Sequence, residues 1–327
     1  ESGPYTSVGD LDLHRPYIDA ISFPCDACGT PTTRVREVAD VWLDSGAMPF
    51  AQWHYPFENK EMIDEELQFP ADYIAEGIDQ TRGWFYSLLN VGVLLGKGPA
   101  YEHVISLGLL LDKQGQKMSK SKGNVVDPWE MIRKYGADTV RWYFFGASDP
   151  GEPKRFDETD LGKTLRKLFL ILYNSFVFYG GYIKTHGMPN ADQDPTHLLD
   201  RWILLRGEEV VRDMTRLLDT YEIGRAARML EELVEDLSHW YIRRSRNRFA
   251  EGDGDARATL GHVLQLISKL MAPFTPFFSE ALYCSLTRHA QKGETRESVH
   301  LADWPSADMR GKTFDTKLIK SMARVRA

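Results

Sequence analysis

The sequence predicts an α/β portion followed by an all-α portion. Between residues 39 and 111, short apolar runs flank one long apolar stretch, as in a strand–helix–strand unit. Beyond about Asp157, apolar residues recur at steps of three and four, which is typical of amphipathic helices. A chain of 327 residues with 43% hydrophobic residues is long enough for two or more domains with proper cores.

Residues 1–38 predict a small, irregular lobe, because Pro16, Pro24 and Pro31 interrupt any long element. The apolar runs that follow predict strands with a crossover helix between them. We expect strands at 41–43, 73–75 and 104–111, and a helix over 81–95.

Helices are expected after that region. Asp127 and Pro128 are typical of an N-cap and a first helical position, and a further helix should cover 138–145. Three apolar sets with helical spacing predict a bundle with short connections. These sets are Leu198, Trp202, Leu205, Val210, Met214, Leu217 and Tyr221; Leu230, Leu233, Leu237 and Tyr241; and Val263, Ile267 and Leu270. The polar stretch 187–195 predicts a domain boundary.

Composition excludes several classes of protein. No window approaches eighteen uninterrupted apolar residues and the first residues lack the regions of a signal peptide, so we expect a cytoplasmic protein without membrane contact. Cys25, Cys28 and Cys284 are too few for a disulfide framework. The formal net charge of -7 means that any nucleic-acid contact requires a local basic patch.

A lysine-rich pentapeptide, KMSKS at residues 117–121, lies between Gly115 and Gly123. We call residues 115–123 the lysine loop. Lysine ammonium groups suit developing phosphate charge, and flexible glycines would let the loop close over a nucleotide. On composition alone, a solvated basic turn is the simpler interpretation.

A second candidate site lies where the strand at 73–75 gives way to the long helix. Ligands of parallel sheets bind at the carboxyl ends of strands, and Gly77 provides a turn there. Glu76 and Asp79 could accept hydrogen bonds from an amine and from ribose hydroxyls. Alternatively, Asp79 caps the helix and Glu76 is a surface charge, although capping and ligand binding are compatible.

Together these motifs resemble isoleucyl-tRNA synthetases, a family of class I aminoacyl-tRNA synthetases. The similarity rests on three segments in family order: residues 40–46 (DVWLDSG), residues 76–85 (EGIDQTRGWF) and the KMSKS with its trailing Lys-Gly-Asn. Residues 237–249 and 271–277 resemble the anticodon-binding helices of that family. The segment VWLDSG at 41–46 favours the isoleucyl member over the valyl and leucyl ones.

The resemblance implies the second half of a Rossmann-like parallel-sheet nucleotide-binding domain, followed by an anticodon-binding helical bundle. The implied domains are a remnant of an inserted zinc-knuckle region (1–38), the half-domain with the KMSKS motif (39–125), a helical connecting region (126–190) and the bundle (191–327).

The resemblance also implies ATP-dependent activation of isoleucine to isoleucyl-adenylate, with Mg²⁺, and transfer of isoleucine to tRNA(Ile). Lys117 and Lys120 would supply mobile positive charge to the phosphates, with Ser119 and Ser121 as hydroxyl donors. The implied contacts to the aminoacyl-adenylate are Glu76, Gly77, Asp79 and Gln80, with Trp42 and Trp84 as walls of the side-chain pocket. A branched aliphatic chain must be recognised by apolar area and shape, although ordinary core packing is the alternative for each tryptophan.

The sequence also departs from the family pattern. It contains no His-x-Gly-His segment, which the family uses on ATP, and most of the editing insertion is lacking. We therefore expect a C-terminal fragment, or one half of a split enzyme, whose N-terminal catalytic segment is in the same gene or on a separate chain. Such a fragment would be inactive alone. The alternatives are a non-catalytic tRNA-binding module and valyl specificity.

Cys25 and Cys28 have the C-x-x-C spacing of a zinc knuckle. They are half a site, because structural zinc takes four ligands and Cys284 is predicted to be a packed small hydrophobe. This half site makes Zn²⁺ a further candidate cofactor of the chain.

Four arginines crowd the end of one bundle helix: Arg243, Arg244, Arg246 and Arg248. They could bind RNA phosphates, with Trp240 and Tyr241 stacking on bases. Alternatively they offset the helix dipole and pair with Glu231, Glu232 and Glu235. We expect only some of the four to touch tRNA.

Overall fold

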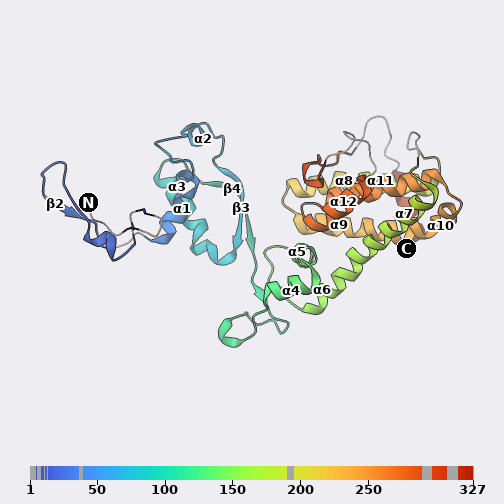
Figure 1. Cartoon of the computed structure of the whole chain (residues 1–327), viewed down its shortest axis with the longest axis horizontal. Coiled ribbons are helices and arrows are strands. Elements are labelled where there is room, and N and C mark those ends of the chain that lie inside the picture. The colour runs from blue at the N-terminus through green and yellow to red at the C-terminus, as the bar shows by residue number, and fades with distance from the viewer. Residues whose placement is uncertain are drawn as a thin grey trace. The chain divides into compact units, whose positions relative to one another are not determined.

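The computed structural model describes residues 5, 9–10, 12, 14–36, 40–189, 195–288, 297–307 and 316–326, without the side chains of residues 120, 316 and 326. The chain forms two compact units, Glu1–Val104 and Ile105–Ala327 (Figure 1). Each unit is described by itself below.

The first unit combines short strands with helices. Its elements are η1 (Tyr17–Ala20), β1 (Ser22–Pro24), β2 (Pro31–Thr33), α1 (Val41–Ala51), α2 (Glu61–Asp64), β3 (Ala71–Gly77), η2 (Ile78–Arg82), α3 (Trp84–Leu94) and β4 (Tyr101–Leu107), the last of which runs past the unit boundary. β1 pairs with β2 in an antiparallel hairpin, and β3 lies beside β4. Because α3 connects β3 to β4, the predicted strand–helix–strand unit is confirmed.

The predicted strand at 41–43 is wrong, because these residues begin α1. The Asp40 carboxylate accepts a hydrogen bond from the Trp42 N–H at 2.9 Å and caps the helix. α1 packs on α3, and the contact is close at Gly46: a Cβ there would lie 2.7 Å from the Ser87 carbonyl oxygen. The core of the unit includes Phe50 and Leu88.

The second unit begins with the lysine loop and continues as helices. Its elements are β5 (Leu110–Leu111), η3 (Lys120–Lys122), α4 (Pro128–Tyr135), α5 (Ala137–Gly146), β6 (Lys154–Arg155), α6 (Glu158–Thr164), η4 (Leu165–Phe169), α7 (Leu170–His186), α8 (Leu198–Asp219), α9 (Ile223–Glu235), η5 (Asp236–Ile242), α10 (Arg243–Ala250), α11 (Gly254–Met271), α12 (Pro276–Thr287), η6 (Val299–Leu301) and α13 (Thr316–Arg326). β5 and β6 pair in parallel.

The predicted start of α4 is confirmed, since Pro128 is its first residue and the Asp127 carboxylate accepts the Trp129 N–H at 2.9 Å. The helix predicted over 138–145 corresponds to α5. In the described part of the chain, no strand follows β6, as the loss of alternation after Asp157 predicts.

The bundle core confirms the predicted helical spacing for two of the three sets: Leu230, Leu233, Leu237 and Tyr241 are fully buried, as are Val263, Ile267 and Leu270. The first set fits in part, since Trp202, Val210, Met214 and Leu217 are buried, whereas Leu198 is 53% exposed and Tyr221 lies beyond the end of α8. Residues 190–194 of the predicted boundary lie outside the described residues. Among the helices that the structure describes, none combines the length and apolar character needed to cross a bilayer.

Helix α5 joins the start of the second unit to its bundle. The Asp138 Oδ2 accepts the Phe278 N–H of α12 at 2.6 Å. The Arg141 guanidinium donates to the carbonyl oxygens of Phe274 at 2.9 Å and Pro273 at 3.1 Å. Trp142 Nε1 donates to Glu231 of α9 at 2.6 Å. The contacts of Asp138 and Arg141 hold the α11–α12 turn against α5, and the Trp142 contact holds α9 there.

Candidate active site and nucleic-acid interface

The end of β3 and the start of α3 bring together four of the predicted site residues. Glu76 and Asp79 are exposed, while Gly77 and Gln80 are half-buried. A Cβ at Gly77 would lie 2.6 Å from Asp79 Oδ1, so a larger residue there would make the exposed Asp79 side chain move. The exposed carboxylates at this strand end can accept hydrogen bonds from a polar ligand.

Gln80, rather than Asp79, supplies the side-chain acceptor at the start of α3, whose N-cap residue is Gly83. The Gln80 Oε1 accepts the Trp84 N–H at 2.8 Å, and its Nε2 donates to Asp79 Oδ2 at 3.2 Å. The capping role that we considered for Asp79 is therefore wrong. The Asp79 carboxylate is held in place by Gln80 and keeps its exposure, so it is available for a ligand.

The two tryptophans differ in how firmly they are held. Trp84 is half-buried, and its Nε1 donates to the Ser45 carbonyl oxygen of α1 at 3.1 Å. Trp42 is 41% exposed, and its ring edge lies near Gly83, where an added Cβ would come within 3.1 Å of it. Both rings thus lie around the start of α3, close to Gln80.

In the second unit, both glycines of the lysine loop adopt a backbone conformation that other residues rarely take. Gly115 and Gly123 have φ angles of +80° and +64°, in the left-handed region that favours glycine. Lys117 is exposed, and the Ser119 and Ser121 hydroxyls lie 3.2 Å apart. The side chain of Lys120 lies outside the described residues.

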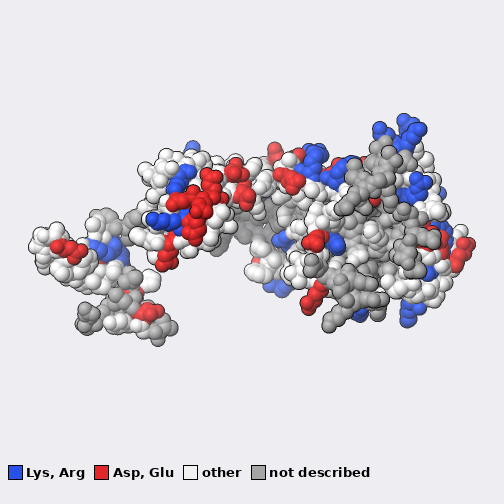
Figure 2. All heavy atoms as spheres, turned by 90° about the horizontal axis from the view of Figure 1, so that it is seen from above, with Lys and Arg blue, Asp and Glu red and all other residues white. Residues whose placement is uncertain are grey.

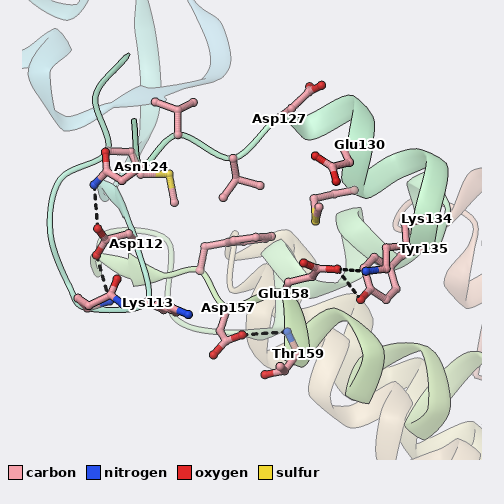
Figure 3. Close-up of a pocket in the computed structure, with 16 residues that line it drawn as sticks. Asp112, Lys113, Asn124, Asp127, Glu130, Lys134, Tyr135, Asp157, Glu158 and Thr159 are labelled. Atoms are coloured by element: carbon pink, nitrogen blue, oxygen red, sulfur yellow. Dashed lines mark hydrogen bonds and ion pairs between the residues drawn. The ribbon is translucent and has the colours of Figure 1, made fainter. Parts of the chain in front are cut away.

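A groove of about 750 Å³ lies beside the lysine loop (Figure 3). Its lining comprises Asp112, Lys113, Gln114, Met118, Asn124, Val125, Val126, Asp127, Glu130, Met131, Lys134, Tyr135, Phe156, Asp157, Glu158 and Thr159. Met118 packs against the small core that includes Met131 and Phe156. Glu158 accepts from Tyr135 at 2.9 Å and pairs with Lys134. Sequence reasoning missed this groove, because its residues come from separate segments with no shared spacing.

The four arginines divide into two groups. Arg243, Arg244 and Arg246 are exposed on α10, and the Arg244 guanidinium lies 4.8 Å from the centre of the Trp240 ring. Arg248 instead reaches inward and donates to both carboxylate oxygens of the fully buried Asp200, at 2.8 and 2.6 Å.

The pairing that we considered between these arginines and three glutamates is not observed. Glu231 accepts from Trp142, Glu232 from Arg206, and Glu235 pairs with Lys167 at 3.4 Å. In the view of Figure 2, Asp and Glu side chains gather over the first unit, whereas Lys and Arg side chains are spread over the second. Exposed positive charge on α10 is thus the local basic patch that a nucleic-acid contact would need.

The two N-terminal cysteines lie at the tip of the β1–β2 hairpin. The Gly29 N–H donates to the Cys25 carbonyl oxygen at 2.8 Å, and the Cys28 thiol donates to Thr30 Oγ1 at 3.3 Å. When the Thr30 hydroxyl and N–H instead donate to the Cys28 sulfur, they stabilise the thiolate, and these bonds lower the pKa of Cys28. Within the described residues, no group of three or more His, Cys, Asp or Glu side chains could hold a metal ion. Cys284 is half-buried, as predicted, and burial raises its pKa.

The sequence of this chain is similar to those of known tRNA synthetases. Residues 12–157 match the family described as tRNA synthetases class I (I, L, M and V), and residues 200–327 match the anticodon-binding domain of tRNA ligase. The chain is 48% identical over 309 residues to the isoleucine--tRNA ligase of Thermus thermophilus, covering 91% of this chain and 29% of the relative. It is 43% identical over 327 residues to that of Streptomyces avermitilis, covering 98% and 31%. The chain therefore spans about three-tenths of the length of these relatives.

Solved structures give the same fold. The chain superposes on the Agrobacterium radiobacter K84 agnB2 LeuRS, from its ternary complex with tRNA and LeuAMS, with a TM-score of 0.70 and 20% identity, covering 88% of this chain and 36% of the other. The Mycobacterium tuberculosis methionyl-tRNA synthetase, in complex with methionyl-adenylate, gives a TM-score of 0.62 and 18% identity, covering 80% and 53%. By their family matches, residues 12–157 belong to the class I tRNA synthetase family and residues 200–327 to the anticodon-binding domain family of tRNA ligases.

Proposed function

We propose that this chain is part of an isoleucine–tRNA ligase, which activates isoleucine with ATP and transfers it to tRNA(Ile). The observation that carries the proposal is 43% to 48% identity to isoleucine--tRNA ligases over nine-tenths or more of the chain. We further propose that a preceding segment, in the same gene or on a separate chain, supplies the rest of the active site.

The lysine loop would act on the phosphates of ATP. Lys117 is exposed on the loop, and Lys120 is the second candidate by its position in the motif. Their ammonium groups would stabilise the charge that develops on the α-phosphate and the departing pyrophosphate, with the Ser119 hydroxyl as a further donor. Mg²⁺ would be bound mainly through the ATP phosphates and would share their charge.

The end of β3 would hold the aminoacyl-adenylate. Glu76 and Asp79 are exposed acceptors for the amine and ribose hydroxyls, and Gly77 leaves room for the Asp79 carboxylate. Gln80 would orient Asp79 through their 3.2 Å hydrogen bond. The rings of Trp42 and Trp84 would wall an apolar pocket for the branched side chain.

The bundle would bind tRNA through α10. Arg243, Arg244 and Arg246 are exposed and could contact phosphates, and Trp240 could stack on a base. Arg248 is excluded from this role, because its guanidinium is engaged with Asp200. We expect Arg244→Met to lower the slope of log affinity against log salt concentration by about 1 in tRNA filter binding.

The test is isoleucine-dependent exchange between ATP and pyrophosphate, measured on the chain alone and together with the preceding segment. We expect exchange only for the combination, and faster with isoleucine than with valine. Lys117→Gln should lower the rate about 100-fold, the order seen when one donor to transition-state charge is lost. Lys184→Gln is the matched control, because Lys184 is an exposed lysine on α7 that does not line the groove, and it should leave the rate within about twofold.

A second candidate is a tRNA-binding module without catalysis, favoured by the match of residues 200–327 to an anticodon-binding domain. Retention of tRNA with no exchange under either condition would refute the ligase and support the module. Faster exchange with valine would instead assign valyl specificity.

A further inference from the structure

The lysine loop is closed at its base by two side chains that flank it. Asn124 Nδ2 donates to Asp112 Oδ2 at 2.8 Å, so residues twelve positions apart meet across the base of the loop (Figure 3). Neither residue belongs to the KMSKS pentapeptide.

Asp112 organises the first side of the loop. Its Oδ1 accepts the backbone N–H groups of Gln114 at 3.0 Å and Gln116 at 2.8 Å. Its own N–H donates to the Gln116 carbonyl oxygen at 2.9 Å, and its carbonyl oxygen accepts the Gly115 N–H at 2.9 Å. The bonds from Asn124 and Gln116 lower the pKa of Asp112, so the carboxylate stays ionised and accepts at every site.

Asn124 organises the second side. Its Oδ1 accepts the Ser119 N–H at 2.9 Å. Its Nδ2 donates one hydrogen bond to Asp112 and a second, at 3.3 Å, to the Lys117 carbonyl oxygen. Only an amide side chain offers an acceptor and two donors at these positions. Asn124 therefore fixes the backbone on both sides of Met118, which packs into the core beside the groove.

We propose that Asp112 and Asn124 are positioning residues that set where the lysine loop presents its ammonium groups to the phosphates. The inference rests on the proposed function and deepens it. With Met118 held in the core and the backbone of Lys117 and Ser119 held by Asn124, the exposed Lys117 side chain starts from a fixed point. A fixed backbone keeps the Lys117 ammonium near the position where phosphate charge develops in the transition state. Such positioning raises the rate of adenylate formation.

A swap of the two side chains tests the pairing. Asn124→Asp places two carboxylates against each other, so their repulsion should open the base of the loop. Asp112→Asn removes the carboxylate that accepts from Gln114, Gln116 and Asn124, and it leaves two neutral amides facing each other. In the double variant, the amide at position 112 can again accept from Gln114 and Gln116 and donate to the carboxylate at position 124, which can accept from Ser119. The carboxylate cannot donate to the Lys117 carbonyl oxygen, so the longer, 3.3 Å bond is lost. We therefore expect each single change to disturb the loop and the double change to restore most of its order.

Two readouts separate loop order from catalysis. Hydrogen exchange measured by mass spectrometry on the 327-residue chain follows the amides of residues 117–124 without any need for activity. We expect exchange there to rise about tenfold in Asn124→Asp, which matches the loss of a hydrogen bond of ordinary strength, and to return to within about twofold in the swap. Gln114→Ala is the control, because only its backbone takes part in the turn.

The second readout is isoleucine-dependent exchange by the chain with the preceding segment. We expect Asn124→Asp and Asn124→Ala to lower kcat about tenfold or more, with the KM for isoleucine unchanged, and the swap to recover most of kcat. Unchanged hydrogen exchange in Asn124→Asp, or a normal kcat despite a disordered loop, overturns the inference. If the unsubstituted protein is inactive, the proposed function itself fails, and the catalytic role of the pair fails with it.

Discussion

Replacing Arg248 with methionine should destabilise the helical bundle far more than the same change at Arg244. Arg248 is 15% exposed at its side chain and forms two bonds to Asp200, whose side chain is 0% exposed. The same carboxylate accepts the Tyr241 hydroxyl at 2.7 Å, and Arg248 Nε also donates to Asp253 at 2.8 Å. Removing the guanidinium would leave a buried carboxylate with only a neutral donor.

The expected cost follows from that geometry. Breaking a buried ion pair by removing one partner costs about 3–5 kcal/mol, because the remaining charge loses both water and partner. Methionine retains an apolar stem, so the loss reflects the charge rather than packing. The exposed Arg244 loses a contact with the Trp240 ring worth about 0.5–1 kcal/mol.

The assay is urea unfolding of each variant, followed by circular dichroism. The free energy of unfolding should fall by about 3–5 kcal/mol for Arg248→Met, with a melting temperature roughly 6 to 20 °C lower. Arg248→Lys should recover only part of the loss, because an ammonium cannot make the two-pronged contact. An Arg248→Met variant within about 1 kcal/mol of the parent, at equal m-value, would refute the reasoning.

Three further predictions concern other parts of the chain. Gly46→Ala should lower the stability of the first unit by about 1–3 kcal/mol in thermal unfolding, because its Cβ would meet the Ser87 carbonyl oxygen; a neutral result would mean that α1 shifts freely on α3. Burial raises the pKa of Asp138, so the native state retains a proton that the unfolded chain has lost, and stability falls as pH rises from about 4. Asp138→Asn, which can still accept the Phe278 N–H, should flatten that slope in urea midpoints at pH 4 to 7, and an identical slope contradicts the assignment. Zinc titrated into the chain and followed by calorimetry should bind the Cys25–Cys28 turn far more weakly than a four-ligand site, and tight binding would require ligands beyond the described residues.

The helices of the bundle were predictable from the sequence because apolar residues at steps of three and four lie on one face of a helix, and that face is buried. Leu230, Leu233 and Leu237 repeat at helical steps and are fully buried. The start of α4 was predictable for a local reason, since Asp127 and Pro128 fit the first turn of a helix by their own geometry.

The start of α1 was not predictable by the same means. Three apolar residues at 41–43 fit a strand and a helix equally well, and length is needed to separate the two. The helix is decided by the Asp40 cap and by the close packing of Gly46 on α3, which is a contact between distant segments.

The different burial of Arg248 and Arg243 could have been predicted from the helical spacing of their neighbours. Tyr241, Ser245 and Phe249 recur every four residues and form a buried row. Arg248 lies next to that row in a helix, whereas Arg243 lies on the opposite side. The bond between Asp112 and Asn124 left no such signal, because both are polar residues in irregular segments twelve positions apart.

The contact of α5 with the α11–α12 turn has a consequence for synthesis of the chain. Asp138 bonds to a backbone group 140 positions later, and Arg141 to one 133 positions later. At ribosomal rates of about 5–20 residues per second, α5 would leave the ribosome roughly 7 to 28 s before these two partners exist. Glu231 of α9, the partner of Trp142, follows after only 89 positions, so α5 can pack on the first helices of the bundle well before the α11–α12 turn completes the contact.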